Sequence, residues 1–209
     1  MIGIMADSHG KADTILAALD VFKSLNCRRI YHLGDVCDST RPETAEACLR
    51  PLQAHHVITI KGNNDHAIVA NHLGRDEAPV SPKVLKYLQN LPLVKNHHYA
   101  ILTHSLPFAD KLGLSCMIGT MSETEAHRAF TEFPHHVIFR GHSHMPEILQ
   151  PRGRRIQSGK PAAGVKIDLT GKRPCVVTCG ALTRGLCMVW HPEDNYIKSL
   201  SFNINPEVY

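Results

Sequence analysis

The amino-acid sequence predicts an α/β domain in which parallel strands come first and mixed strands are added later. The first half alternates between short apolar runs, typical of buried strands, and longer segments whose apolar residues recur at helical spacing. The last third has no helical period, and its short apolar runs are separated by Gly, Pro and Asn, which is typical of antiparallel strands. The length fits one domain, so we expect residues 1–209 to form a single unit.

Three predicted strands alternate with two predicted helices in the first half of the chain. The strands are expected at residues 1–6, 29–33 and 57–60, and the helices at 11–25 and 41–53. Each of the first two strands is followed by a helix that returns the chain to the end of the sheet where that strand began. This order therefore predicts parallel strands joined by right-handed crossovers.

The middle of the chain is less regular, and capping residues mark its helices. Ser81 precedes Pro82 in the pattern of a helix start, and Ser122 is followed by Glu125 at capping-box spacing. We expect helices over 81–91 and 122–130, a hairpin of 93–94 and 99–103 around 96–98, a loop with a short helix over 107–121, and strands at 136–140, 164–169, 175–178, 186–190 and 196–202.

The charge balance is modestly basic and does not identify a nucleic-acid binder. The formal net charge is +4, and the basic residues are scattered apart from the run Arg152, Arg154 and Arg155. That run could attract an anion, but a solvated turn beside Gly153 explains it better. We therefore expect no nucleic-acid partner, while the oligomeric state stays open.

We expect neither a targeting signal nor a transmembrane segment. The apolar start of the chain runs straight into Asp7 and His9, without the basic region and cleavage site of a signal peptide. No apolar run approaches the roughly 20 residues that span a bilayer. The seven cysteines are odd in number, and Cys175 and Cys179 are too far apart for a CxxC motif. Free thiols in a cytoplasmic protein are the expectation.

Residues of the kind that bind metals follow five predicted strands directly. In an α/β sheet, ligands bind beyond the carboxyl ends of the strands. Any one of these short motifs occurs by chance in many proteins, but chance is a poor explanation for five at one edge. The motifs are Asp7-Ser8-His9, Gly34-Asp35-Val36-Cys37-Asp38, Gly62-Asn63-Asn64-Asp65, His104 and Gly141-His142-Ser143-His144.

This set of side chains fits a pair of metal ions. Two cations about 3.5–4 Å apart need a ligand that bridges them, and Asp35 is the expected bridge because a carboxylate has two oxygens. His142 and His144 can serve different metals, since a one-residue gap in extended chain changes the side-chain direction. Mixed imidazole and carboxylate ligands favour Mn, Fe, Zn or Ni over Ca or Mg. We expect two divalent metal ions, Mn as the first choice, with Fe, Zn, Ni or Mg as alternatives.

The ordered motifs resemble those of the calcineurin-like metallophosphoesterase superfamily. Their order and spacing match from residue 7 to residue 144, and residues 178–184 loosely resemble a loop of its small single-domain prokaryotic phosphodiesterase branch. The resemblance implies an α/β fold, namely a two-sheet mixed β-sandwich flanked by helices in four layers (α-β-β-α), with the metals at one edge.

The resemblance also implies two sets of metal ligands and a mechanism. The implied activity is that of a metal-dependent phosphoric ester hydrolase (a phosphodiesterase or phosphatase), which cleaves small phosphodiesters or phosphomonoesters by attack of a metal-bound hydroxide. Arg184, in the 178–184 loop, is a candidate for binding the substrate phosphate. The first metal would be bound by Asp7, His9, Asp35 and His144, and the second by Asp35, Asn63, His104 and His142.

One position departs from the superfamily pattern. The superfamily usually has a histidine where this chain has Asn64, and that histidine is thought to protonate the leaving group, oriented by an aspartate that matches Asp38. Asn64 can donate a hydrogen bond to phosphate and pair with Asp38, but it cannot transfer a proton. Because general acid catalysis contributes about 10²–10⁴-fold, we expect a preference for leaving groups that need little protonation. Alternatively, the proton comes from His66, His72, His97 or His98.

Other functions stay open beside this one. A nucleotide or dinucleoside polyphosphate hydrolase would use the same site. A non-catalytic protein-interaction module, as in the retromer subunit with this fold, would be expected to lose metal ligands, and all seven are present. A nuclease for polymeric DNA would need a basic groove. The protein Ser/Thr phosphatase branch is disfavoured because its Asp-Arg-Gly motif is here Asp38-Ser39-Thr40.

Overall fold

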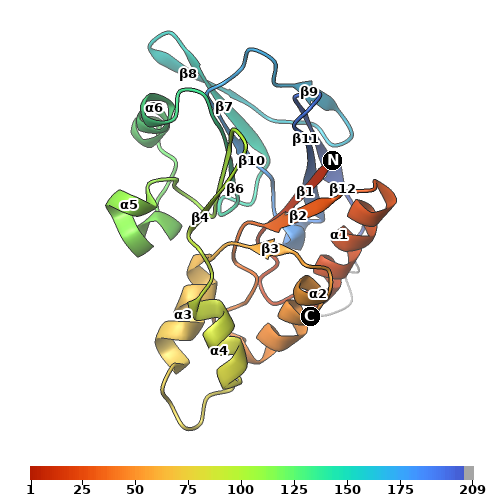
Figure 1. The fold of residues 1–209 in the computed structure, drawn as a ribbon, viewed down its shortest axis with the longest axis vertical. Helices are drawn as coiled ribbons and strands as arrows, with labels where there is room; N and C mark the ends of the chain where they lie inside the picture. Colours follow the sequence, from red (N-terminus) through yellow and green to blue (C-terminus); the bar gives the residue numbers. More distant parts are fainter. Residues whose placement is uncertain (205–209) are drawn as a thin grey trace.

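Two six-stranded β-sheets stack face to face at the centre of the computed structural model, which describes residues 1–204 (Figure 1). The first sheet has the strand order β3 (Ile58–Thr59), β2 (Arg29–His32), β1 (Ile2–Met5), β11 (Leu186–His191), β12 (Tyr196–Ser201) and β9 (Lys166–Asp168). The second has the order β4 (Val94–His97), β5 (Ala100–Thr103), β6 (Val137–Arg140), β10 (Cys175–Thr178), β7 (Glu147–Arg152) and β8 (Arg155–Gly159).

Each sheet combines a parallel centre with antiparallel strands. β1 pairs in parallel with β2, and β2 with β3, as the sequence predicts. β11 then adds antiparallel to β1, followed by β12 and β9. In the second sheet β5, β6 and β10 are parallel, while β4, β7 and β8 are antiparallel additions. Since parallel strands end at one edge, the segments that follow them are brought together there.

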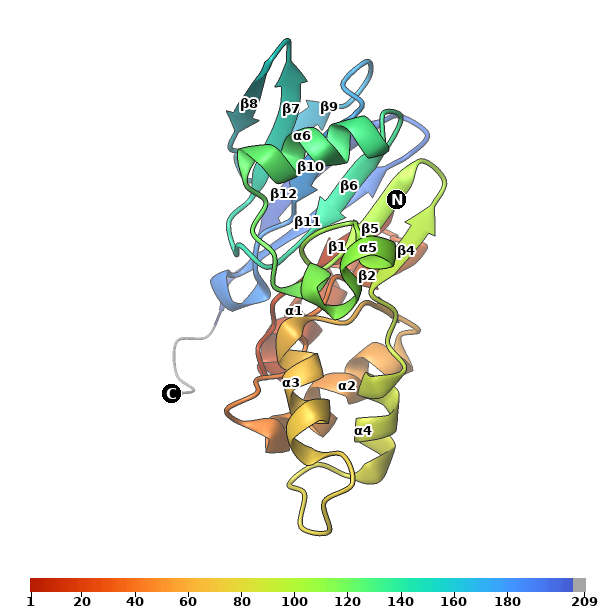
Figure 2. The same ribbon diagram turned by 90° about the vertical axis from the view of Figure 1, so that its left-hand side faces the viewer.

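Helices cover the outer face of each sheet, which completes four layers. One outer layer contains α1 (Ala12–Ser24), η1 (Pro42–Thr44), α2 (Ala45–Ala54), α3 (Asn63–His72) and α4 (Pro82–Gln89). The other contains α5 (Ala109–Leu112), η2 (Gly113–Met117) and α6 (Glu123–Glu132). Figure 2 shows α5 and α6 in front of the second sheet, with α3 and α4 extending below the sheets. The α/β sandwich fold implied by the resemblance is confirmed.

Three hydrophobic cores separate the layers. The core between the sheets contains Ile4, Phe139 and Trp190, all 0% exposed. The core under the first helical layer includes Phe22 of α1. Phe108 lies in the third core, where the Arg128 guanidinium sits 4.0 Å from its ring centroid. Burying apolar side chains on both faces of each sheet is what fixes the sandwich.

Most expected elements are present, and the main differences lie in residues 41–54, 63–72 and 147–159. The expected helix over 41–53 is divided into the 3-10 turn η1 and helix α2. Helix α3 was not expected, because its sequence is polar apart from a short apolar stretch at Ile68 and Val69. The β7–β8 hairpin was not expected either, because β8 is largely exposed and has no apolar alternation.

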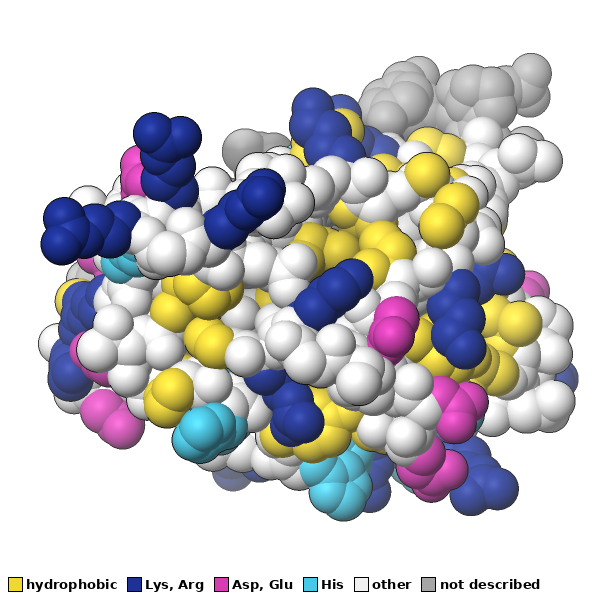
Figure 3. Space-filling view, turned by 90° about the horizontal axis from the view of Figure 1, so that it is seen from above, with side chains coloured by type: hydrophobic (Ala, Val, Ile, Leu, Met, Phe, Trp, Pro, Cys, Tyr) yellow, Lys and Arg dark blue, Asp and Glu magenta, His cyan; other side chains and the backbone are white. Residues whose placement is uncertain are grey.

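The arginine run lies in the turn of the β7–β8 hairpin. Arg152 pairs with Arg155 across the turn, and Gly153 supplies the left-handed conformation with φ 62°. Figure 3 looks onto this end of the molecule and shows Lys and Arg side chains standing apart among apolar and uncharged atoms. The prediction of a solvated turn is confirmed.

Helix composition and cysteine state agree with the sequence-based expectations. Within residues 1–204, no helix combines the length and the apolar character that crossing a membrane requires. All seven cysteines are free thiols, and Cys27 is the one among them that is partly exposed. The chain therefore relies on its hydrophobic cores rather than on disulfides.

Candidate metal centre

The side chains predicted to bind metals converge at the carboxyl ends of the parallel strands. β1, β2 and β3 of the first sheet, together with β5 and β6 of the second, each lead into a loop that carries part of the set. The two sheets therefore contribute from opposite sides of one edge. The residues brought together are Asp7, His9, Asp35, Asn63, His104, His142 and His144.

One group of these side chains contains His9, His144 and Asp7. The two imidazole Nε2 atoms of His9 and His144 are 3.0 Å apart. His144 Nε2 also lies 3.8 Å from Asp7 Oδ1. Ligand atoms of these three residues all fall within 4.8 Å of one another, close enough to share one ion. The side chains of His9 and His144 are 22% and 34% exposed, so this group faces solvent.

A second group is built around His104 and is more deeply buried. His104 Nδ1 donates a hydrogen bond to the Leu33 carbonyl oxygen at 2.8 Å, so the neutral ring presents an unprotonated Nε2. That Nε2 lies 3.0 Å from Asn63 Oδ1 and 3.2 Å from His142 Nδ1. An imidazole held in one tautomer by its other nitrogen is the usual arrangement of a metal ligand.

Asp35 lies between the two groups. Its Oδ2 is 3.8 Å from His9 Nε2, and its Oδ1 is 3.6 Å from His104 Nε2. Each oxygen accepts one hydrogen bond from Asn64, from the backbone N–H and from Nδ2, both at 2.8 Å. A carboxylate offers about four acceptor positions, so each oxygen keeps one for an ion. The geometry of Asp35 suits a bridging ligand.

The charges at this site also fit cations. Burial, followed by repulsion from Asp35, raises the pKa of Asp7 well above its usual range. Burial, and after it electrostatic repulsion from His104, lowers the pKa of His142 to about 4. Burial also lowers the pKa of His104 and of His144. Neutral imidazoles and crowded carboxylates are the donor set that bound divalent ions would stabilise.

Several of these residues have an unfavourable backbone conformation. A positive φ is uncommon outside glycine and costs about 1–3 kcal/mol where the surroundings impose it. Such strain concentrates at functional sites, so it supports a site here. The residues concerned are Asp7 (φ 58°), His9 (45°), Asp35 (53°), His142 (66°) and His144 (63°).

Two glycines allow the strand-end loops to approach closely. A Cβ on Gly34, whose φ is +97°, would lie 2.7 Å from the Gly62 nitrogen and 2.8 Å from His104 Nδ1. A Cβ on Gly62 would overlap the Asp35 backbone nitrogen and Oδ1. A side chain at Gly34 would therefore push the third loop and His104 away, and one at Gly62 would push Asp35 away.

The pairing of Asn64 differs from the sequence-based expectation. Asn64 does not pair with Asp38; its Nδ2 donates to Asp35, and its Oδ1 accepts from Ser39 Oγ at 2.7 Å. Asp38 instead accepts from Thr40 and from Arg41 Nε at 2.9 Å. The start of α3 at Asn63 explains the difference, because it aims the Asn64 backbone N–H and amide at Asp35.

Arg184 lies at the solvent-facing side of the cluster. The 3-10 turn η3 (Leu182–Arg184) is held against the end of β1, where Thr183 N donates to the Asp7 carbonyl oxygen at 3.3 Å. The positive charge of Arg184 contributes to lowering the pKa of His144, after burial and His9. Arg184 is thus close enough to act on an anion near His144.

Two further ionisable residues support this site: Arg140, which belongs to none of the predicted motifs, and Asp65, the last residue of the third motif. Arg140 is 3% exposed, donates to the Ser105 carbonyl oxygen at 3.0 Å and acts electrostatically on Asp7. Asp65 is 0% exposed and accepts from Gly62 N and Cys37 N, which ties the second and third loops together. A charged residue that ends an apolar strand, as Arg140 does, is the sequence signal for such a role.

The alternative proton donors are unevenly placed. His97 and His98 lie at the β4–β5 turn, at the other end of β5 from His104. His66 and His72 are on α3, and His66 is in its first turn. His66 is therefore the alternative nearest to the ligand loops along the chain.

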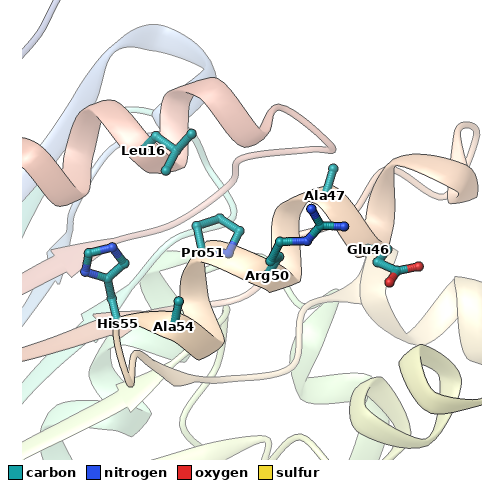
Figure 4. A pocket seen from close by; sticks show the side chains of 7 residues that line it. All are labelled: Leu16, Glu46, Ala47, Arg50, Pro51, Ala54 and His55. Atoms are coloured by element: carbon teal, nitrogen blue, oxygen red, sulfur yellow. The ribbon is translucent and has the colours of Figure 1, made fainter.

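A groove between α1 and α2 is separate from this cluster. It has a volume of about 520 Å³, and none of the predicted metal ligands borders it. Figure 4 shows Leu16 of α1 facing Pro51, Arg50 and Ala54 of α2. A largely apolar groove without convergent ionisable groups does not offer the chemistry of the ligand cluster.

Comparison with known proteins gives the same fold. The family model described as the calcineurin-like phosphoesterase superfamily domain matches residues 1–166. The structure of a metallophosphoesterase from Sphaerobacter thermophilus superposes with a TM-score of 0.77 at 19% identity, over 98% of this chain and 88% of that chain. A hypothetical protein from Pyrococcus horikoshii OT3 superposes with a TM-score of 0.66 at 11% identity, over 99% and 90%. No curated protein sequence matches the chain.

Proposed function

The chain belongs to the calcineurin-like phosphoesterase superfamily, and we propose that it hydrolyses small phosphodiesters or phosphomonoesters with two divalent metal ions. Membership makes it a phosphoric ester hydrolase, as the sequence predicts. The dinuclear centre, the metal and the substrate are the proposed parts. Mn is the first choice of metal, with Fe, Zn, Ni or Mg as alternatives, because the donors are imidazole nitrogens and carboxylate or amide oxygens.

The position of Asp35 carries the proposal. Its two carboxylate oxygens face His9 on one side and His104 on the other. One set of ligands would be Asp7, His9, Asp35 and His144, and the other Asp35, Asn63, His104 and His142. Two divalent ions held there would supply a nucleophile at neutral pH and neutralise the charge that builds on the phosphoryl oxygens.

The remaining residues of the site would bind and orient the ester. Arg184, on the solvent-facing side, would pair with a phosphate oxygen. Asn64 would act as a substrate-binding and catalytic residue by donating a hydrogen bond toward the phosphate. Asp38 would act indirectly, since it holds the turn that carries Ser39, and Ser39 in turn binds the Asn64 amide oxygen.

Asn64 also favours a second candidate, hydrolysis of nucleotides or dinucleoside polyphosphates. An amide cannot protonate a departing oxygen. One N–H of Asn64 Nδ2 donates to Asp35 and its Oδ1 accepts from Ser39, so the second N–H is what it can offer a substrate. A phosphate or an aryl oxide leaves without that help, whereas an alkoxide does not. Nucleotide anhydrides and aryl diesters are therefore the substrates that this site would cleave fastest.

Metal-dependent turnover tests the proposal directly. The full chain would be stripped of metal, reloaded with Mn, Mg, Ni or Zn, and assayed on bis-p-nitrophenyl phosphate and p-nitrophenyl phosphate. Asp35→Asn should abolish turnover, and Asp168→Asn, an exposed aspartate on β9, is the matched control that should not. Turnover that survives Asp35→Asn would contradict the proposal. Binding of two metals without turnover on any ester would instead favour the non-catalytic interaction module.

A further inference from the structure

A second cavity lies at the opposite end of the strands from the metal-ligand cluster. Its volume is about 560 Å³, and it is bordered by the amino end of the chain, the β4–β5 turn and the end of β11. Figure 2 shows the amino end beside the β4–β5 hairpin. Its ionisable rim consists of Arg28, Arg29, His97, His98, His191 and Glu193.

Two strands lead from this cavity to the metal-ligand cluster and set the distance between them. β1 has Ile2 at the cavity and leads to Asp7, and β2 begins at Arg29 and leads to Asp35. At about 3.3 Å per residue, the separation along the two strands is about 17–20 Å. None of the predicted metal ligands borders the cavity. A molecule bound here would occupy a site of its own.

The rim of the cavity carries more positive than negative side chains. Within residues 1–204, Arg28 and Arg29 form no ion pair. Arg29 instead donates from Nη1 to His97 Nδ1 at 2.9 Å. Glu193 is the single carboxylate among the described residues of the rim. Two guanidinium groups against one carboxylate around a cavity favour an anionic occupant.

His97 adds a directed donor to these charges. Since an arginine can only donate, His97 Nδ1 accepts, and the neutral ring carries its proton on Nε2. The His98 ring centroid is 4.5 Å away. Burial, and after it electrostatic repulsion from His98 and Arg29, lowers the pKa of His97. This direction agrees with a positive local potential. An anion in the cavity could accept from the His97 Nε2–H beside the Arg29 guanidinium.

We propose that this cavity binds a phosphorylated small molecule of nucleotide size. Guanidinium groups bind phosphate through paired hydrogen bonds, and Arg28 and Arg29 are both free of ion pairs for that purpose. The volume of about 560 Å³ lies within the range of roughly 300–1,000 Å³ typical of small-molecule sites. It is far larger than a lone phosphate needs. The proposal does not depend on the hydrolytic function.

An NMR titration of the full ¹⁵N-labelled chain tests this site. The probes are AMP, adenosine and inorganic phosphate, each added with and without Mg²⁺. AMP should shift the amide signals of residues 25–29, 97–98 and 191–193 under both conditions, because the site needs no metal. Phosphate should shift the same signals more weakly, and adenosine should not shift them.

Arginine variants connect the shifts to the proposed groups. Arg28→Ser combined with Arg29→Ser should weaken AMP binding at these signals at least tenfold. Arg152→Ser combined with Arg154→Ser, in the β7–β8 turn, is the matched control with the same change in charge and should bind AMP as the unmodified chain does. Equal shifts with adenosine, shifts confined to residues near the metal ligands, no shift at millimolar AMP, or unchanged affinity in the first variant would each overturn the proposal.

Discussion

Replacing Gly62 by alanine should destabilise the protein and displace Asp35 from the metal centre. The φ of Gly62 is −98°, so alanine meets no backbone strain there. Its Cβ would, however, overlap the backbone nitrogen and Oδ1 of Asp35. Backbone atoms cannot rotate away as the end of a flexible side chain can, so the Asp35 loop itself must move. The substitution therefore acts on the proposed bridging ligand through packing alone.

The size of the effect follows from the cost of overpacking. Extra methyl groups forced into a packed site cost about 1–3 kcal/mol, and contact with backbone places Gly62→Ala at the upper end, about 3 kcal/mol. For a chain of this length each kcal/mol lowers Tm by about 2–4 °C. Gly159→Ala on β8 is the matched control, because a Cβ there meets nothing within 4 Å.

Thermal unfolding and metal analysis measure both consequences. Gly62→Ala should lower Tm of the metal-free chain by about 6–12 °C and reduce the bound metal below that of the unmodified chain. Gly159→Ala should leave both quantities near those of the unmodified chain. A Gly62→Ala protein with the Tm and metal content of Gly159→Ala would refute the close approach of the second and third loops.

Three further changes test other parts of the site. Asn64→His should raise kcat for alkyl phosphodiesters by about 10²-fold or more, because it restores a proton donor. The kcat for aryl diesters should change little. Equal gains in kcat on both substrates would contradict the role of Asn64. Arg184→Ala should raise KM for phosphodiesters about tenfold, because a hydrogen bond to a charged group is lost. An unchanged KM with a lower kcat would contradict a role of Arg184 in binding the substrate in its ground state. Burial, and after it electrostatic repulsion from His104, lowers the pKa of His32 to about 3. Below pH 6.5 the unfolded chain therefore takes up a proton that the folded chain does not. The free energy of unfolding should fall as pH falls from about 6.5 toward 3. His32→Gln should flatten that decline by about 1 kcal/mol per pH unit in urea unfolding, and an unchanged slope would show that other groups cause it.

The strand-end motifs could be predicted from the sequence because their signal is local. Each motif follows an apolar run, and parallel strands must end at one edge, so Asp35 and His104 could be expected to meet although they are far apart in the chain. The structure places their atoms 3.6 Å apart. The prediction of the two ligand groups depends on that topology together with the family resemblance.

Contacts set by helix geometry or by exposed edges could not be predicted in the same way. Asn64 pairs with Asp35 rather than Asp38 because α3 begins at Asn63, and α3 has too little apolar periodicity to be recognised. Arg140 has no motif of its own, and its burial beside Asp7 depends on the packing of both sheets. The β7–β8 hairpin is held by backbone pairing at the edge of the sheet, which exposed polar sequence does not reveal.

Anomalous diffraction from crystals of the Mn-loaded protein tests the central claim most directly. The account predicts two anomalous peaks per chain, about 3.5–4 Å apart, with the Asp35 carboxylate between them. His9 and His144 should bind one ion, and His104 and His142 the other. A single peak, two peaks that Asp35 does not bridge, or peaks away from these residues would contradict a dinuclear centre.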